Sequence, residues 1–444
     1  MNLLLPFKLL STLFPVVFLL VLPALSRAQS QAPSDSRRQE LIEKRKQKLQ
    51  DPPPIKPNKV EDAFRYIEGR GKRLLFGINW KNFYPKFGGP RAGSGFGGGV
   101  RYYNYRIKDS DVTVEGSALF SMRNYQKYNF QLGAFNRTDP AFFTGPSDLG
   151  APFDFMEEMR PGRAKRRSKF VLFADFEHHR YPQERFWGLS SNSDPENRSN
   201  YHINSTSYSV ISGYKFTRWL AAAAGAGLLQ TDLKQGTDER FPTTQELFDD
   251  TSAPGLDKQP DFIRLASVLY FNYQDRPGNP HKGGIIGFFF FRYDDIGGDE
   301  FDFSRFALDA RHYIPLGSKQ RVLALRLVTL NDRPDKGSRV PFYLMSTLGG
   351  SQTLRGFHDF RFRDANLFEI SAEYRWEPAP ALELALYYDT GKVYGPDTQF
   401  DFKGLRKSYG FGIRIKTPTG TFLRLDISKS NEGNRLQFAF GPSF

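Results

Sequence analysis

Cysteine is absent from all 444 residues of this sequence. Disulfide bridges and thiolate metal sites are therefore excluded, and so is the lipid-bearing cysteine of a bacterial lipoprotein. Mean hydropathy is also low, at −0.52, which is too polar for a protein that crosses a membrane with helices. A fold built from membrane-spanning helices is therefore not expected.

Motifs for metal binding and catalysis are scarce. The histidines show no metal-ligand spacing apart from the adjacent pair His178 and His179, and neighbours on a strand point to opposite faces. No Gly-x-Ser-x-Gly nucleophile elbow occurs. We therefore expect no enzyme activity, no cofactor, no metal and no catalytic residue. An outer-membrane hydrolase that uses Glu177, His178 and His179 at a barrel rim is kept as an alternative.

Acidic residues are outnumbered by basic ones, 48 to 62, and the formal net charge is +14. Such an excess can serve nucleic-acid binding, but the sequence has no compact basic motif or recognition helix. We expect no nucleic-acid partner. The basic groups are instead expected to face anionic lipid headgroups of an outer membrane and to line a polar lumen.

Aromatic residues, in contrast, are abundant, with 43 Phe and 21 Tyr, while charged residues make up 25% of the chain. This combination is typical of a β-barrel whose outer face is apolar and whose interior is wet. The composition therefore favours a strand-built membrane protein.

The first 28 residues have the composition of an export signal. Lys8 precedes the apolar residues 9–25, and Ser26 and Ala28 stand at the positions that a signal peptidase needs. We predict a signal peptide over residues 1–28, cleaved after Ala28; a retained membrane anchor is the alternative. Residues 29–69 are charged and proline-rich and are predicted to be a periplasmic tail or linker. Residues 70–444 are predicted to be the outer-membrane barrel.

From residue 73 onward, apolar and polar residues alternate with a period of two. Near the C-terminus, for example, Leu384 and Leu386 alternate with Glu383 and Ala385. We predict an all-β fold, a transmembrane antiparallel barrel of about sixteen strands, closed because an open edge leaves backbone groups unpaired in lipid. A soluble β-sandwich is the alternative. The predicted strands are 73–81, 93–107, 111–122, 125–136, 167–181, 200–214, 217–231, 260–274, 283–294, 301–315, 321–331, 367–377, 381–392, 405–417, 420–430 and 434–444.

An even number of strands puts both termini on the periplasmic side. The long connections 232–259 and 331–366 then become surface loops. Residues 136–166 fit this scheme poorly, because they form a long connection on the periplasmic side. The strand register before about residue 170 is therefore left open.

One segment, residues 348–357, places a single arginine among small and apolar residues. In a barrel, such a loop can fold back into the lumen, where Arg355 needs carboxylate partners to offset its desolvation. The alternation in the next two strands turns Glu373 and Asp389 toward this same polar side. A solvated loop arginine is the alternative.

Residues 275–284, 348–357, 373–375 and 387–391, together with the terminal Phe444, resemble the BamA/TamA-type outer-membrane assembly-factor superfamily, also called the bacterial surface antigen family. The resemblance is densest over residues 260–444. It implies a sixteen-stranded barrel whose sixth surface loop folds inward. In that loop it implies an Arg-Gly-aromatic motif at Arg355, Gly356 and Phe357, with Glu373 and Asp389 as lumen partners. It also implies a C-terminal sorting signal at Phe438, Phe440 and Phe444.

The resemblance implies a function in the insertion or translocation of proteins or lipids at the outer membrane. Client outer-membrane proteins or lipids, and accessory assembly subunits, are the partners that it implies. The chain departs from better-known members because it lacks their periplasmic POTRA repeats ahead of the barrel. A passive pore or a surface receptor barrel is the alternative function.

Overall fold

The structure is a computed structural model that describes residues 39–40, 43, 82–104, 112–134, 169–276, 279–379, 381–417 and 420–444. The chain forms two compact units, Met1–Ala63 and Phe64–Phe444. In the first unit only Gln39, Glu40 and Glu43 are described, and all three are helical. The predicted signal peptide and the predicted strand 73–81 lie outside the described residues.

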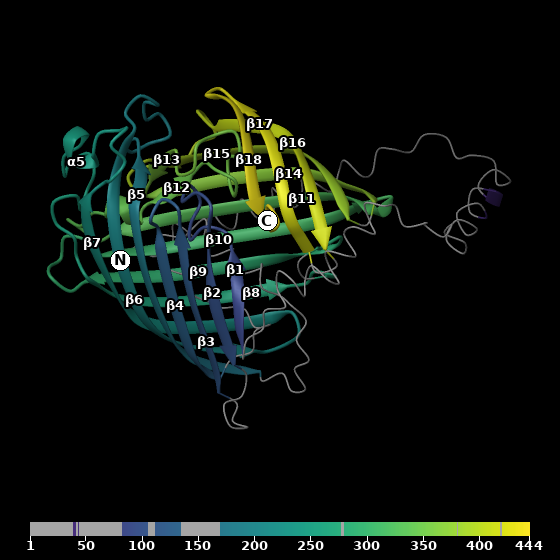
Figure 1. The fold of residues 1–444 in the computed structure, drawn as a ribbon, viewed down its shortest axis with the longest axis horizontal. Coiled ribbons are helices and arrows are strands. Elements are labelled where there is room, and N and C mark those ends of the chain that lie inside the picture. Colours follow the sequence, from purple (N-terminus) through teal and green to yellow (C-terminus); the bar gives the residue numbers. More distant parts are fainter. Residues whose placement is uncertain are drawn as a thin grey trace. The chain divides into compact units, whose positions relative to one another are not determined.

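Sixteen strands of the second unit form one antiparallel sheet in which each strand pairs with the next strand of that sheet along the chain (Figure 1). This confirms the predicted all-β antiparallel fold and the number of strands. Among the described residues no pairing joins the first strand to the last, so barrel closure stays a prediction. The strands of this sheet are β1 (Phe83–Phe87), β2 (Gly97–Asn104), β3 (Thr113–Ser121), β4 (Gln126–Ala134), β5 (Phe170–Phe186), β6 (Ser199–Lys215), β7 (Leu220–Gln235), β8 (Phe262–Asn272), β9 (Gly283–Asp295), β10 (Phe303–Leu316), β11 (Ser318–Pro334), β14 (Asn366–Ala379), β15 (Leu382–Tyr394), β16 (Arg406–Thr417), β17 (Gly420–Ser430) and β18 (Gly433–Phe440).

The connection between β11 and β14, residues 335–365, carries structure of its own and is called the inner connection below. It contains the 3-10 helix η6 (Phe342–Leu344) and the paired strands β12 (Ser346–Leu348) and β13 (Phe362–Asp364). Another connection, between β7 and β8, holds the short helix α5 (Thr244–Leu247). None of the helices in the described part of the chain has the length and apolar composition needed to span a bilayer.

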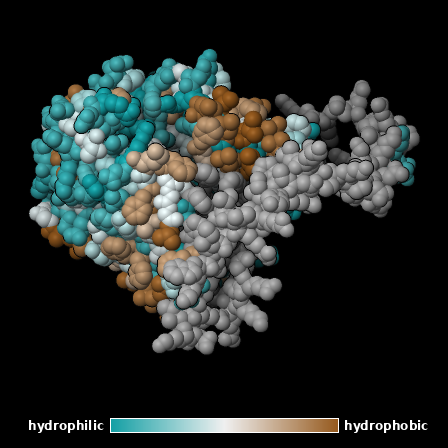
Figure 2. All heavy atoms as spheres, viewed as in Figure 1, coloured by the Kyte–Doolittle hydropathy of each residue, from teal (hydrophilic) through white to brown (hydrophobic). Residues whose placement is uncertain are grey.

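The alternation of side chains gives the sheet two opposite faces. Leu386, Phe411, Ile427 and Phe438 are among the large apolar residues exposed on one face. Ionic residues lie buried on the other face, and Figure 2 shows hydrophobic residues gathered on parts of the strand surface while hydrophilic residues cover the region around α5. An apolar exterior around a polar interior is the arrangement that lipid requires of a barrel.

The connections alternate between the two ends of the sheet, because every strand pair is antiparallel. The end that carries the β1–β2, β3–β4, β5–β6, β7–β8 and β9–β10 connections is called the loop end below. Counted from β1, the first strand that the structure describes, the inner connection is the sixth connection at this end. The connection from β4 to β5, of which only residue 169 is described, falls at the opposite end. This is the long connection that fitted the predicted scheme poorly, and for which the strand register was left open.

The strand bounds differ from the predictions at the two edges of the sheet and also at β5 and β7, which end at Phe186 and Gln235 rather than at residues 181 and 231. The first described strand is β1, which the sequence analysis placed in a connection. The last strand ends at Phe440 rather than at Phe444, because Gly441 has a φ of +81° and redirects the chain. Phe444 was expected beside Phe438 on the apolar face; it is instead buried against Tyr313, on the opposite face.

Candidate functional site

Arg355 lies in the inner connection, and its predicted partners lie on neighbouring strands of the main sheet. Glu373 is on β14 and Asp389 is on β15, and their register sets Glu373 opposite Tyr387 and Asp389 opposite Ser371. The period of two turns both carboxylates to the buried face of the sheet. The structure brings Arg355, Glu373 and Asp389 together there, and all three side chains are almost fully buried.

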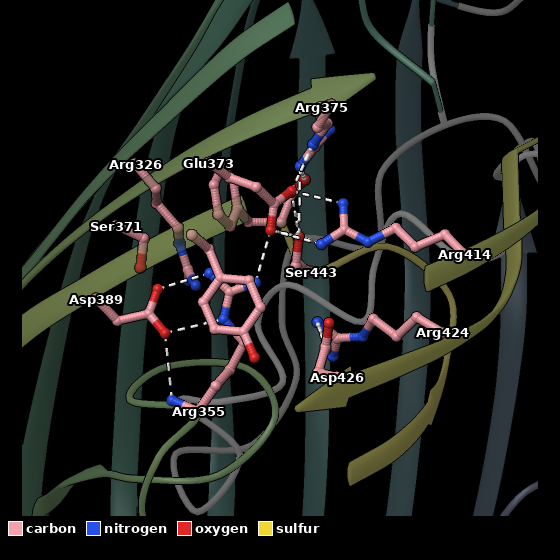
Figure 3. Close-up of polar contacts among 12 residues, drawn as sticks. Arg326, Arg355, Ser371, Glu373, Arg375, Asp389, Arg414, Arg424, Asp426 and Ser443 are labelled. Atoms are coloured by element: carbon pink, nitrogen blue, oxygen red, sulfur yellow. Dashed lines mark hydrogen bonds and ion pairs between the residues drawn. The ribbon is translucent and has the colours of Figure 1, made fainter. Parts of the chain in front are cut away.

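The three guanidinium nitrogens of Arg355 all donate hydrogen bonds to these two carboxylates (Figure 3). Nε and Nη2 bind the two oxygens of Asp389 at 2.8 and 2.6 Å, and Nη1 binds Glu373 Oε2 at 2.6 Å. The backbone N–H of Arg355 also donates to Asp389, at 3.3 Å. Bidentate, charge-assisted bonds of this kind are strong and directional, so they hold the loop tip in one position.

The surroundings of Arg355 add contacts that the sequence analysis did not foresee. The guanidinium lies 3.5 Å from the centre of the Tyr387 ring, in a cation–π contact. Ser428 and Ser430 on β17 donate hydrogen bonds to the carbonyl oxygens of Arg355 and Gly356, at 2.6 and 2.8 Å. The loop tip is therefore bound through its backbone to β17 as well as through its side chain to β14 and β15.

The two residues after Arg355 fit this close approach for different reasons. A Cβ added to Gly356 would lie 2.6 Å from Ser408 Cβ and 2.8 Å from Ser430 Cβ, so only glycine fits against the strands. Phe357 is fully buried in an apolar cluster and contacts Phe362, with ring centres 5.0 Å apart. An arginine, a glycine and an aromatic residue thus serve as ionic anchor, close contact and apolar anchor.

Glu373 is the centre of a wider ionic network. Besides Arg355 it accepts hydrogen bonds from Arg375 Nε at 2.6 Å and from Arg414 Nη1 and Nη2 at 2.6 and 2.5 Å. Ser443 Oγ, in the C-terminal segment, donates to both of its oxygens at 3.1 and 3.2 Å. Three guanidiniums and one hydroxyl therefore converge on one buried carboxylate (Figure 3).

From Arg414 the network continues toward the end opposite the loop end. Arg414 Nη1 donates to Glu383 at 2.9 Å, and Lys416 contacts both Glu383 and Glu377. Glu377 also lies 2.8 Å from His281 Nε2, in the connection between β8 and β9. Isolated buried charges are costly, but here each has opposite charges beside it, which offsets its desolvation.

The adjacent histidines do not form a common site. His178 is half-buried and its Nδ1 lies 2.8 Å from Thr206 Oγ1, whereas His179 is buried and stacks on Tyr181. His179 Nδ1 lies 3.7 Å from the carboxylate of Glu177. Across the described ranges, no group of three or more histidine, aspartate and glutamate side chains is placed to hold a metal ion.

The aromatic residues of the predicted sorting signal lie in different environments. Phe438 is 69% exposed on the apolar face, and Phe444 is 5% exposed on the opposite face. The backbone of Phe440 ends β18, while its side chain is outside the described part of the structure. Tyr313 and Arg375 donate hydrogen bonds to the Phe444 carbonyl, at 3.2 and 3.3 Å.

Several partners in this site were missed by sequence reasoning. Alternation placed Arg414, Tyr387 and Ser428 on the polar face, but it could not show which of them meet the loop tip, because the path of the inner connection past these strands is not set by alternation. Ser443 was missed because the chain was expected to continue as a strand. The glycine at position 441, directly after an aromatic residue, was the available signal for a turn.

The sheet of sixteen sequential antiparallel strands, the exposed apolar face and the arginine bound to the ionic face define a membrane β-barrel with an anchored inner connection. Residues 112–444 match the Omp85 superfamily domain, and the chain belongs to the Omp85 superfamily. This confirms the resemblance found in the sequence and places the chain among outer-membrane barrels of the assembly and translocation family.

One solved structure supports this fold, and two others are reported with it. BamA from Haemophilus ducreyi lacking POTRA domains 1–3 is 15% identical, with a TM-score of 0.54, over 80% of this chain and 68% of that chain. CdiB from Acinetobacter baumannii is 12% identical (TM-score 0.43; 81% and 56% covered), and CdiB from Escherichia coli is 11% identical (0.48; 80% and 61%). The likeness to BamA shows the fold alone. A comparison with curated proteins gave no match.

Proposed function

We propose that this barrel helps to insert or translocate proteins or lipids at the outer membrane, by a mechanical rather than an enzymatic action. The observation that carries the proposal is the anchoring of Arg355 to Glu373 and Asp389. This contact ties the inner connection to the wall formed by β14 to β17. One part of the barrel is thereby held while another part moves.

The part proposed to move is the seam between β1 and β18. These strands contain 5 and 8 residues, whereas β5 and β6 contain 17 residues each. A shorter strand makes fewer ladder hydrogen bonds, so less free energy is needed to displace it. An extended client segment can then pair with the strand edge through main-chain hydrogen bonds. Delivery of clients is assigned to accessory subunits.

The composition of the outer membrane tests this role. A deletion strain is complemented with the parent gene, with Arg355→Ala, or with Arg218→Ala as a matched control from the exposed β6–β7 connection. We expect the deletion and Arg355→Ala to lower the level of outer-membrane proteins or to alter the lipids of the outer leaflet. The parent and Arg218→Ala should restore both. Unchanged proteins and lipids, together with steady single-channel conductance, would instead identify a passive pore.

A second proposal concerns assembly of the barrel itself. Removal of Phe444 should reduce the amount of barrel inserted in cells, if the terminal aromatic serves as a sorting signal. Because the same deletion removes the contact with Tyr313, the stability of the protein refolded in vesicles is measured in parallel. Poor insertion in cells with preserved stability in vesicles supports a sorting role. Normal insertion in cells contradicts it.

A further inference from the structure

Five arginines gather around residues 358–360 of the inner connection, at the loop end of the sheet. They are called the mouth arginines below. They come from five different parts of the chain: the β1–β2 connection, the β3–β4 connection, the end of β5, the β5–β6 connection and the inner connection. The mouth arginines are Arg91, Arg123, Arg185, Arg198 and Arg361.

Aromatic rings and a glycine hold this group together. The guanidinium carbons of Arg198 and Arg361 lie 5.9 and 5.5 Å from the centre of the buried Trp187 ring, which is itself 6.0 Å from the ring of His358. Arg91 lies 4.3 Å from the Phe360 ring centre.

The remaining two mouth arginines meet at Gly93. Arg123 Nη1 donates to the Gly93 carbonyl at 2.8 Å. A Cβ at Gly93 would lie 3.5 Å from both Arg185 Nη2 and Asp359 Oδ2, so Arg185 and the tip of the inner connection also meet at this glycine. The loop end is therefore built around a compact cationic group rather than scattered surface arginines.

The positive charge of this group is only partly balanced. Glu184 lies 3.2 Å from Arg91, Asp359 lies 3.8 Å from Arg185, and Glu432 lies 3.0 Å from Arg361. Among the residues that the structure describes, no carboxylate contacts Arg123 or Arg198. Three of the five mouth guanidiniums thus have a carboxylate within ion-pair distance, and two have none.

Arg198 is the member of the group best placed to bind a ligand. Its guanidinium lies 3.5 Å from the centre of the Phe241 ring, which fixes its plane. Its Nε is buried, and within the described ranges it has no hydrogen-bond partner. Burial and the charge of Arg185 lower the pKa of Arg198 to about 10. A solvated surface arginine would have neither this ring contact nor this buried donor.

His358 does not reduce the positive charge of the group. Burial, followed by the charges of Arg435 and Arg185, lowers the pKa of its imidazole to about 3. The ring is therefore neutral near pH 7 and can accept a hydrogen bond. The electrostatic excess at this end is carried by guanidiniums, whose planar fork matches the oxygens of a phosphate group.

We propose that the mouth arginines form a binding site for a phosphate-bearing anion, with Arg198 and Arg123 as its principal ligands. A phosphate monoester carries close to two negative charges at neutral pH, which matches the two unbalanced guanidiniums. A lipid headgroup and a free polyphosphate both present this chemistry. The site is independent of the proposed role in insertion or translocation, because it involves neither Arg355 nor the seam.

Binding measurements on the folded full chain in a zwitterionic detergent test the site. Inorganic pyrophosphate, short-chain phosphatidic acid and short-chain phosphatidylcholine are titrated separately, and binding is followed by calorimetry and by tryptophan fluorescence. We expect saturable binding of pyrophosphate, of phosphatidic acid or of both. We expect no binding of phosphatidylcholine. Arg198→Gln should weaken that binding about tenfold or more, through loss of charge-assisted hydrogen bonds. Arg218→Gln, in the exposed connection at the opposite end, should leave it unchanged.

The outcomes separate the two sources of phosphate. Saturation by phosphatidic acid alone identifies a lipid headgroup, and saturation by pyrophosphate alone identifies a free anion. Trp187→Phe should abolish the fluorescence change while the calorimetric signal persists. If Arg198→Gln does not migrate as a folded barrel on unheated gels, Arg123→Gln is tested in its place, because Arg123 is exposed and its substitution should not disturb folding. The proposal is overturned if neither pyrophosphate nor phosphatidic acid shows saturable binding. It is also overturned if the arginine variant, Arg198→Gln or its replacement Arg123→Gln, binds the probe as tightly as Arg218→Gln does.

Discussion

Two of the attachments that bind the inner connection to the barrel differ in their chemistry. At η6, Phe342 and Leu344 are buried in an apolar cluster, where Phe342 contacts the rings of Phe186 and Tyr201 at 4.9 and 5.0 Å. At the tip, Arg355 is held by hydrogen bonds to carboxylates. One end of the connection therefore packs like a protein core, and the other is bound like a charged ligand.

The two attachments contribute differently to how strongly the inner connection is bound and to where it is held. Apolar burial is non-directional, and its free energy depends on the area removed from water. The backbone of η6 also accepts hydrogen bonds from Arg305 and Arg363, at 2.6 and 3.1 Å, so the apolar contribution at this place comes from the buried side chains. Charge-assisted hydrogen bonds depend on distance and angle, so the tip is stabilised in only one place. We infer that η6 contributes mainly to stability and that Arg355 contributes mainly to the placement of the connection against the ionic face of the sheet.

The largest effect is expected from Glu373→Gln, which removes the charge shared by Arg355, Arg375 and Arg414. Uncompensated buried guanidiniums should lower the free energy of unfolding by about 3–5 kcal/mol. Urea titration of protein refolded into lipid vesicles measures this loss. Glu239→Gln, at an exposed position beside α5, serves as the control. Equal stability of the two variants would show that the network contributes nothing at the tip.

The apolar attachment is broken by Phe342→Ala, which leaves a cavity in the cluster around η6. The free energy of unfolding should fall by about 3 kcal/mol. Channel conductance in planar bilayers should stay close to that of the parent, because the Arg355 contacts are intact. Phe96→Ala, at an exposed position in the β1–β2 connection, is the control. A large rise in conductance would mean that η6 also determines the position of the connection.

The ionic attachment is weakened more selectively by Arg355→Lys. Lysine keeps the charge but cannot bind Asp389 and Glu373 through a planar fork, so we expect a loss of about 2 kcal/mol in the free energy of unfolding. Conductance should rise, because the tip is no longer held in one place. Arg218→Lys should change neither quantity. If Arg355→Lys conducts like the parent, the tip contact does not set the position of the connection.

The smallest effect is expected from Ser443→Ala, which removes one hydroxyl donor from Glu373 while its three guanidinium partners remain. The loss should be about 1 kcal/mol, without a change in conductance. The same urea titration measures it, with Ser318→Ala at the exposed start of β11 as the control. A loss above about 2 kcal/mol would show that the C-terminal segment shares the anchoring of the inner connection.

The alternating pattern was sufficient to predict most of the strands, because a strand with one face in lipid and one in water must alternate with a period of two. It located β17 at residues 420–430 and β16 within one residue. It was less accurate at the sheet edges, where β1 is short and Gly441 turns the chain away from the strand direction. These ends depend on contacts with other parts of the chain.

In the candidate site, too, some features were predictable from the sequence and others depended on contacts between distant parts of the chain. The alternation alone turned Glu373 and Asp389 to one face, and the resemblance to a family suggested Arg355 as their partner. The additional bonds from Arg414, Ser443 and the serines of β17 could not be read from the sequence. They join residues that are up to 74 positions apart, and only strand register and barrel curvature bring them within hydrogen-bond distance.

The sequence by itself determined the type of protein, an antiparallel barrel with an apolar exterior, because the period of its side chains is a local property of the backbone. It also determined which residues face inward. The tertiary structure alone decided which inward charges meet, that Phe444 is buried rather than exposed, and that five arginines from distant segments gather at the loop end. Those outcomes depend on the curvature of the whole sheet and on the path of the inner connection, and neither is encoded in a short stretch of residues.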